Sequence, residues 1–420
     1  MYASSPYGVN LVVALNGSEV FTHVYPDGLL AEECPCPHND PNVWTEAIEC
    51  PPGDYFGQIQ LDFQTFPVIN ISRLAHEVPE RFNRSHSMIH YTVKDNQLYR
   101  RQYGKHGDFK KFSDEIFLSL LRKVKLEDTE FVMNLGDWPG EKRKVDESPL
   151  AILTWGGSKD TRDISVPTWD LTKKTYSSLL QESVDVQTTA ASSLTEWEQK
   201  IEKGFFRGRD SRKERLELVR LAKRYPDKLD AGLTNYFFFR RAGEEEELGK
   251  VERVSMNKFH DFKYQINMDG TVAAYRLPIL LAGNSVVFKH ESNYYEHFYS
   301  QLIPWTHYIP FHANLSDLVN KIDWARDNDV TAQKIGKKGR EFVMNNLTPN
   351  LIYCYYYRVL QTYISRQKGA ATVHEGMELV SQPNHDCQCM QADTTKVRST
   401  DKQDTGKNDH VSEKHVKMDL

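Results

Sequence analysis

The chain has 420 residues, of which 39% are hydrophobic and 26% charged, and its formal net charge is −5. This length suits two domains, because single hydrophobic cores rarely grow beyond about 250–300 residues. The negative charge, the lack of a long Lys/Arg tract and the lack of any run of roughly 18 apolar residues disfavour a nucleic-acid partner and a membrane span.

The first residues carry a hairpin signal. Two β-rich runs, 8–15 and 18–25, flank Asn16-Gly17, a dipeptide that favours two-residue hairpin turns. An isolated hairpin is marginally stable in water. We therefore interpret residues 1–30 as the remnant of a larger β domain, followed by a linker rich in Pro and Cys.

Residues 31–185 are assigned to a first α/β domain. Short apolar runs separated by turn residues are typical of buried strands, and an amphipathic pattern indicates a helix. The predicted elements are strands at 88–94, 130–135 and 150–155 and a helix at 112–124. The Asp95-Asn96 pair predicts a turn into one further short strand.

Residues 186–372 are assigned to a second α/β domain, in which strands and helices alternate. The predicted strands are 204–208, 234–239, 263–268, 285–289 and 305–311, the predicted helices are 213–224 and 271–281, and 315–366 is helical with a break near Pro349. Residues 373–420 are assigned to a disordered polar tail. Beyond Met390 it cannot offset the entropy cost of ordering, so we expect it to be disordered.

Two features suggest an oxidising compartment. The spacings C-P-C and C-Q-C do not match the paired C-x-x-C pattern of zinc sites, so disulfides of undetermined pairing are expected. The six cysteines are Cys34, Cys36, Cys50, Cys354, Cys387 and Cys389, and N-x-[ST] sequons occur at Asn16, Asn70, Asn83, Asn314 and Asn346. The chain ends in Lys417-Met-Asp-Leu420, which is close to a KDEL-type retrieval signal. No signal-peptide pattern follows Met1, so the sequence leaves import into the lumen undecided.

A cluster of cations is the first candidate site. Five positive residues fall between Arg207 and Arg215, at the end of a predicted strand and the start of a predicted helix. Positive charge at a helix N-terminus is unfavourable unless a bound anion compensates it. The cluster therefore predicts an anion site, with a solvated basic face as the alternative.

Two more segments add possible chemistry. In the segment from Asp269 to Arg276, Gly270 permits a tight turn. The backbone N–H groups of this turn could bind a diphosphate together with Arg276. An ordinary turn between strand and helix fits the segment as well. Asp137 follows a predicted strand, where α/β sheets place ligands, and could act as a general base or merely cap the turn. The D-x-D pattern at Asp327-Asn328-Asp329 lies between polar helical segments, and we interpret it as a helix boundary.

These motifs together resemble the KDEL motif-containing protein O-glucosyltransferases, the Rumi-like members of glycosyltransferase family 90. The similarity is carried in order by Asn134 to Pro139, Arg207 to Arg215, Asp269 to Arg276, Tyr294 to Tyr299 and Trp305 to Pro310. It implies an α/β fold of the GT-B type, with two Rossmann-like lobes around a cleft. It also implies that residues 1–30 are the remnant of a filamin-type Ig-like domain.

The resemblance implies transfer of glucose, or of xylose, from a UDP-sugar to serines of EGF-like repeats such as those of Notch. The transfer would invert the configuration of the sugar carbon and would need no metal. It would take place in the lumen of the endoplasmic reticulum. Asp137 then corresponds to the catalytic base, and Trp138 and Trp169 would lie on the acceptor side. The implied donor-binding residues are Arg209, Arg215, Thr271, Val272, Ala273, Ala274, Tyr275 and Arg276. The chain departs from a Notch-modifying relative at two places. It has Arg209 where that relative has Ser, and its segment after Pro167 is shorter. These departures leave the particular EGF serine undetermined.

Two other functions fit the same scaffold. One is a non-catalytic protein of the endoplasmic reticulum that binds EGF-like domains as a chaperone, and intact Asp137, Arg215 and Arg276 argue against it. The other is a glycosyltransferase directed at polysaccharides. The identity of the acceptor separates this function from protein glucosylation.

Overall fold

The computed structural model describes residues 36–82, 87–105, 107–143, 148–176, 195–240 and 243–382, together with strands β1 (Tyr2–Ser5), β2 (Gly8–Leu15) and β3 (Ser18–Tyr25). These three strands form an antiparallel sheet in which β2 and β3 pair as the predicted hairpin. The Asn16-Gly17 turn lies outside the described residues, as do Cys34, Cys387, Cys389 and the end of the chain. The fold is mixed α/β with several sheets.

The first large sheet has six strands in the order β10-β8-β7-β5-β6-β18. Their bounds are β5 (Ser87–Lys94), β6 (Gln97–Gly104), β7 (Thr129–Asn134), β8 (Ile152–Thr154), β10 (Ile164–Ser165) and β18 (Glu378–Val380). β7, β8 and β10 run parallel, whereas β5, β6 and β18 pair antiparallel. Antiparallel pairing is imposed where β5 turns directly into β6 through Asp95 and Asn96, which both have positive φ. This half of the sheet therefore departs from the Rossmann-like pattern expected for it.

The second large sheet has five strands, all parallel, in the order β12-β11-β13-β14-β16. Their bounds are β11 (Ile201–Arg209), β12 (Leu229–Asn235), β13 (Phe262–Asn267), β14 (Val286–His290) and β16 (Ile309–Phe311). The strand predicted at 234–239 is wrong for most of its length. β12 ends at Asn235, and the aromatic residues that follow it form a loop. The carboxylate of Asp210 holds this loop because it accepts hydrogen bonds from the N–H groups of Phe237, Phe238 and Phe239.

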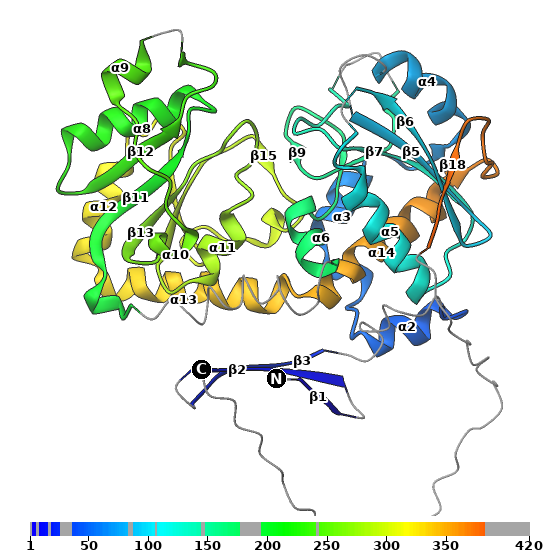
Figure 1. The fold of residues 1–420 in the computed structure, drawn as a ribbon, viewed down its shortest axis with the longest axis horizontal. Coiled ribbons are helices and arrows are strands. Elements are labelled where there is room, and N and C mark those ends of the chain that lie inside the picture. Colours follow the sequence, from blue (N-terminus) through cyan, green and yellow to red (C-terminus); the bar gives the residue numbers. More distant parts are fainter. Residues whose placement is uncertain are drawn as a thin grey trace, which may run out of the picture.

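Helices cover both sheets, and the two sheets lie side by side (Figure 1). The helices are α2 (Pro41–Ala47), α3 (Gly57–Phe63), α4 (Ser72–Phe82), α5 (Lys110–Lys123), α6 (Trp169–Tyr176), α8 (Lys213–Arg224), α9 (Glu244–Leu248), α10 (Met256–Phe259), α11 (Leu277–Ala282), α12 (Leu318–Asp327), α13 (Asp329–Asn346) and α14 (Pro349–Arg366). Short 3₁₀ turns occur at Gly53–Tyr55, Trp197–Gln199 and Tyr299–Gln301, and two-residue strands at β4 (Ile69–Asn70), β9 (Gly157–Ser158), β15 (Tyr294–Tyr295) and β17 (Gln367–Lys368). The D-x-D pattern lies at the boundary of α12 and α13, as predicted.

The helix predicted at 271–281 is wrong in its first half. Residues before Arg276 form bends and a turn, and α11 begins only at Leu277 with Pro278 in its first turn. Proline fits the first turn of a helix and disfavours helical geometry in the residue before it. The segment from Thr271 to Tyr275 is therefore a loop.

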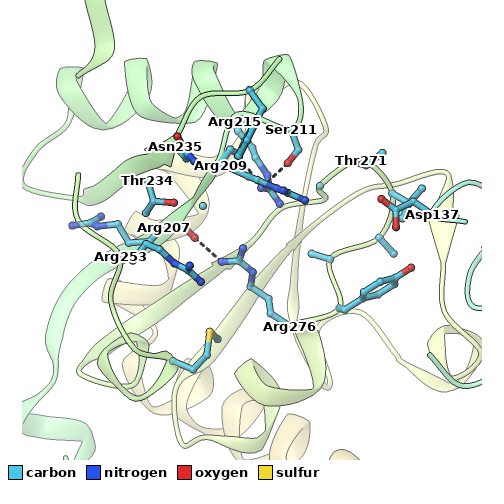
Figure 2. Close-up of a pocket in the computed structure, with 18 of the residues that line it drawn as sticks. Asp137, Arg207, Arg209, Ser211, Arg215, Thr234, Asn235, Arg253, Thr271 and Arg276 are labelled. Carbon is cyan, nitrogen blue, oxygen red and sulfur yellow. Dashed lines mark hydrogen bonds between the residues drawn. The ribbon is translucent and has the colours of Figure 1, made fainter. Parts of the chain in front are cut away.

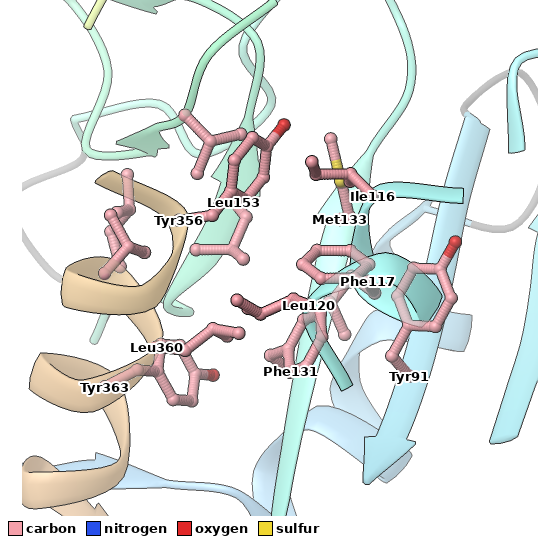
Figure 3. Close-up of a cluster of buried hydrophobic side chains, with 14 of the residues drawn as sticks. Tyr91, Ile116, Phe117, Leu120, Phe131, Met133, Leu153, Tyr356, Leu360 and Tyr363 are labelled. Atoms are coloured by element: carbon pink, nitrogen blue, oxygen red, sulfur yellow. The ribbon is translucent and has the colours of Figure 1, made fainter. Parts of the chain in front are cut away.

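Helix α14 follows the second sheet in the chain but packs in the core of the first one (Figure 1). Tyr356, Leu360 and Tyr363 of this helix lie beside Phe117 of α5 and Phe131 of β7 (Figure 3). Cys354 of α14 is bonded to Cys50, which follows α2, so the expectation of disulfides is confirmed for this pair. The helix is held both by packing and by a covalent link.

After α14 the chain continues along the first sheet. β18 pairs with β6, from Glu378 opposite Arg100 to Val380 opposite Leu98. The tail expected to be disordered from residue 373 is therefore ordered to Gln382, because strand pairing satisfies its backbone groups. Among the residues that the structure describes, no helix is long and apolar enough to cross a membrane.

Candidate active site

A cleft of about 840 Å³ lies where loops from the two large sheets meet. The first sheet and its helices contribute Phe109, Asp137 and Trp169, and the second sheet contributes the cationic loops after β11 and β13. Figure 2 shows Asp137 to one side of this cleft and the guanidinium groups of Arg207, Arg209, Arg215 and Arg276 across from it. The volume is within the range of about 300–1,000 Å³ that is typical of ligand sites.

Asp137 is held on a rigid turn directly after β7. The side chain of Asn134, the last residue of the strand, accepts a hydrogen bond from the N–H of Gly136 at 2.9 Å and donates one to the carbonyl oxygen of Trp138 at 2.7 Å. Asp137 itself is exposed to the cleft. A carboxylate presented in this way can accept a proton from a bound hydroxyl group.

Arg215 is buried in the first turn of α8, and its hydrogen bonds all go to uncharged oxygen atoms. Nε donates to the carbonyl oxygen of Asp269 at 2.7 Å, Nη2 to that of Met268 at 2.9 Å and Nη1 to that of Arg209 at 3.0 Å. Burial, together with the nearby charge of Arg276, lowers its pKa to about 9. The guanidinium is therefore fixed in position, and no carboxylate of the described residues forms an ion pair with it, as expected of a group that binds an anionic ligand.

Gly208 makes room for this arrangement. A Cβ atom at Gly208 would lie 2.8 Å from the ring of Phe206 and 3.1 Å from Nη1 of Arg215. A larger residue would thus push the guanidinium out of its place.

Arg276 provides a second cation at the floor of the cleft. Its Nη1 donates to the carbonyl oxygen of Arg207 at 2.6 Å, and its guanidinium lies over the rings of Phe206 and Phe259. Burial lowers its pKa to about 10, so it stays protonated at neutral pH. Arg209 is exposed and lies over the ring of Phe237, whereas Arg207 is neutralised by Asp230 at 2.7 Å.

The loop from Gly270 to Tyr275 follows β13 and lines the cleft with its backbone and small side chains. Asp269, buried just before it, anchors the loop by accepting hydrogen bonds from Ser292 and from Arg212. Thr271, Val272, Ala273, Ala274, Tyr275 and Arg276 all face the same cleft as Arg209, Arg215 and Asp137. These predicted residues are thus brought together from both sheets.

The two tryptophans proposed for the acceptor side differ in position. Trp169, at the start of α6, stacks on Phe112 at 5.4 Å and contacts Tyr275 edge-to-face at 6.4 Å, so it links the two halves of the cleft. Trp138 does not line the cleft, and its side chain is 57% exposed. Only Trp169 therefore forms part of the cleft wall.

Further lining residues were not singled out from the sequence. They are Phe109, Thr234, Asn235, Phe237, Arg253, Val254, Met256 and Phe259. Thr234 and Asn235 end β12, Met256 and Phe259 lie on α10, and the other four lie in loops, all without a charge cluster or a glycine turn. Their only signal was proximity to the ends of strands, where α/β sheets bind ligands.

The cleft combines unpaired cations, an exposed carboxylate and an aromatic wall. Cations that lack counter-ions can stabilise a phosphate leaving group, and the carboxylate can deprotonate a nucleophile. This combination defines a group-transferring enzyme that uses a phosphate-linked donor, the class to which nucleotide-sugar glycosyltransferases belong.

Comparison with known proteins gives the family. The model of glycosyl transferase family 90 matches residues 45–412, so the chain belongs to this family. Protein O-glucosyltransferase 2 of Danio rerio is 50% identical over 362 residues, which cover 85% of this chain and 72% of that protein. Human protein O-glucosyltransferase 3 is 46% identical over 397 residues, which cover 93% of this chain and 77% of that protein. O-glucosyltransferase rumi of Drosophila pseudoobscura pseudoobscura is 27% identical over 320 residues, which cover 73% of this chain and 76% of that protein. The resemblance drawn from the motifs is confirmed.

Proposed function

We propose that this chain transfers glucose from UDP-glucose to serine hydroxyl groups of folded EGF-like repeats, such as those of Notch. The names of its relatives support protein O-glucosylation. The observation that carries the proposal is the single cleft, in which Asp137 of the first sheet faces Arg215 and Arg276 of the second. We propose a GT-B architecture for the two sheets, with domains at 31–185 and 186–372. Helix α14 belongs to the second of these ranges but packs in the core of the first sheet.

The proposed reaction is a direct displacement with inversion. The carboxylate of Asp137 takes the proton of the serine hydroxyl as its oxygen bonds to C1 of glucose, and the bond from C1 to the UDP oxygen breaks. Negative charge then develops on the diphosphate, where Arg215 and Arg276 are already fixed by hydrogen bonds. Because these two guanidinium groups supply the charge that a divalent ion supplies in other transferases, we propose that the donor site works without a metal.

The roles of the remaining cleft residues follow from their positions. We propose that the loop from Thr271 to Tyr275 contacts the nucleotide with Arg209, and that Trp169 shapes the acceptor side. UDP-xylose is the second candidate donor. We further propose a luminal setting in the endoplasmic reticulum with retrieval by a KDEL-type receptor, and an Ig-like origin for strands β1 to β3.

The decisive experiment compares Asp137→Asn with Asp327→Asn, an exposed aspartate of the D-x-D pattern that lies away from the cleft. We measure UDP release from UDP-glucose in the presence of a folded EGF-like repeat, and the mass of the repeat. Loss of a general base costs about 10²–10⁴-fold in rate, so Asp137→Asn should lose most activity and Asp327→Asn none.

Each other function predicts a different result. A non-catalytic binding protein would give equal background release in the wild type and both variants while still binding the repeat. A transferase directed at polysaccharides would glycosylate free glycans and leave the mass of the repeat unchanged.

A further inference from the structure

A second group of chemically active side chains lies outside the cleft. His90 on β5, Glu130 on β7 and His374, which lies between β17 and β18, place one ligand atom each within 4.8 Å of the others. Oε2 of Glu130 is 3.0 Å from Nε2 of His90 and 2.8 Å from Nε2 of His374. Oε1 of Glu130 accepts a hydrogen bond from the backbone N–H of Thr372 at 2.7 Å. We call His90, Glu130 and His374 the His-Glu-His triad.

The triad contains a buried negative charge without a permanent cation beside it. The side chain of Glu130 is 2% exposed, and its ion-pair partners among the described residues are the two histidines alone. Its two carboxylate oxygens lie within hydrogen-bond distance of His90, of His374 and of the backbone N–H of Thr372. An ionised carboxylate in a buried place needs a compensating charge.

The arginine that lines the same cavity as Glu130 forms no ion pair with it among the described residues. Arg101 donates from Nη1 to the carbonyl oxygen of Glu375 at 2.9 Å, and its guanidinium lies over the ring of Tyr103. Glu130 and His374 both line a cavity of about 400 Å³, which leaves space on one side of the triad. His90 is fully buried, and its Nδ1 has no hydrogen-bond partner, so its polar contact is made through Nε2.

We propose that the His-Glu-His triad binds a zinc ion through Nε2 of His90, Oε2 of Glu130 and Nε2 of His374, with water from the cavity as the fourth ligand. Zinc bonds of about 2.0–2.2 Å in a tetrahedron place neighbouring ligand atoms about 3.3 Å apart. The carboxylate oxygen lies 2.8 and 3.0 Å from the two imidazole nitrogens, and these nitrogens lie within 4.8 Å of each other. Two imidazoles and one carboxylate suit zinc, whereas calcium and magnesium prefer oxygen ligands. This proposal departs from the expectation that the chain uses no metal.

The zinc ion would act as a clamp on the C-terminal segment. His90 and Glu130 belong to neighbouring strands in the middle of the first sheet, whereas His374 belongs to the segment that leads into β18. Other contacts also tie that segment to the sheet. They include the β18–β6 pairing, the hydroxyl of Thr92, which donates to the carbonyl oxygen of Thr372 at 3.2 Å, and Arg100, which pairs with Glu378 at 2.7 Å. The triad shares no lining residue with the donor cleft. The proposed role is thus independent of glucosyl transfer.

The test uses the full chain, freed of metal with a chelator and titrated with zinc chloride. We expect one tightly bound zinc per chain, a higher melting temperature with zinc than without, and visible absorption typical of tetrahedral cobalt after loading with Co²⁺. The variant His374→Ala, whose side chain is 32% exposed in the wild type, should bind zinc at least 10-fold more weakly and lose the zinc-dependent rise in melting temperature.

The matched control is His312→Ala, which removes an exposed histidine following β16 of the other sheet. It should bind zinc as the wild type does. Circular dichroism without metal checks that both variants fold. If the wild type takes up no zinc, the triad is a hydrogen-bonded cluster only and the proposal fails. It also fails if His374→Ala and His312→Ala bind zinc alike.

Discussion

At the scale of single residues, the chain buries several ionisable groups and holds each with hydrogen bonds. Asp62 on α3 is an example at the join between this helix and the first sheet. Its Oδ2 accepts a hydrogen bond from the N–H of Ser165 at 2.7 Å, and its Oδ1 accepts one from Gln58 at 2.8 Å. Burial nevertheless raises its pKa to about 7. The folded chain therefore holds a proton on Asp62 at a pH where the unfolded chain has lost it.

This difference predicts a pH dependence of stability. Folding takes up a proton between the unfolded pKa, near 4, and the folded pKa of about 7, so the contribution of Asp62 to stability falls as pH rises through this window. Asp62→Asn removes the titration. The free energy of unfolding of the wild type, relative to the variant, should fall by about 2.6 kcal/mol between pH 5 and pH 8. About two pH units of this window lie below the folded pKa, and each corresponds to about 1.36 kcal/mol. Urea unfolding of the wild type and of Asp62→Asn at both pH values measures this difference in the free energy of unfolding.

The exposed Asp54 serves as the control for this measurement, because its side chain has no such burial. Asp54→Asn should follow the wild type at both pH values. A constant difference between the wild type and Asp62→Asn across the window would show that Asp62 is ionised in the folded chain.

At the scale of elements, α14 connects parts of the chain that are far apart in sequence. It begins at Pro349, a residue suited to the first turn of a helix, and carries a run of tyrosines into the core of the first sheet. Tyr355 donates to the carbonyl oxygen of Ser165 at 3.2 Å and Tyr356 to that of Pro167 at 2.8 Å, so these buried hydroxyl groups are satisfied. The Cys50–Cys354 bond spans a sequence separation of 304 residues and fixes the helix to the segment after α2.

Removal of this disulfide should destabilise the chain. A cross-link over a long loop restricts the unfolded chain, and its loss typically costs about 2–5 kcal/mol. Cys50→Ala should therefore lower the melting temperature measured by calorimetry, and the double variant with Cys354→Ala should lie close to it. A reductant should bring the wild type toward the variants. Equal melting temperatures of wild type and Cys50→Ala would contradict a stabilising role.

At the scale of the whole molecule, the cleft exists only because loops from the two sheets meet. The proposed anion-binding residues Arg215 and Arg276 belong to the second sheet, and the proposed base Asp137 follows a strand of the first. Contact between Trp169 and Tyr275 links the two sides. Donor binding and proton transfer are thus assigned to different sheets and should be separable by mutation.

UDP should stabilise the folded chain in a way that depends on the second sheet. A ligand at 100 times its dissociation constant adds about 2.7 kcal/mol to the free energy of unfolding. Thermal unfolding with and without UDP should show this shift in the wild type and in Asp137→Asn, which keeps the donor side intact. Arg276→Ala should lose most of the shift. A full shift in Arg276→Ala would mean that the diphosphate binds elsewhere.

Much of the second sheet was predictable because its signals are local. The helix at 213–224 has the predicted bounds, and the strands beginning near Gly204, Lys263 and Ser285 were found within a few residues, since buried parallel strands are short apolar runs between turn residues. Errors arose where a single side chain overrides the pattern of its neighbours, either from a distance in the sequence or from within the segment itself. Asp210 holds the aromatic residues after Asn235 in a loop, and Pro278 delays the start of α11.

The sequence by itself determined the family and the candidate site residues, because Asp137, Arg215 and Arg276 lie in short ordered motifs whose chemistry can be read locally. Only the tertiary structure decided which of these residues share a cleft, that α14 returns to the first sheet, and that Cys50 pairs with Cys354. The His-Glu-His triad shows the reason most clearly. Its members are 40 and 244 residues apart in sequence, so their proximity results from strand pairing and from the path of the chain after α14, which no local pattern records.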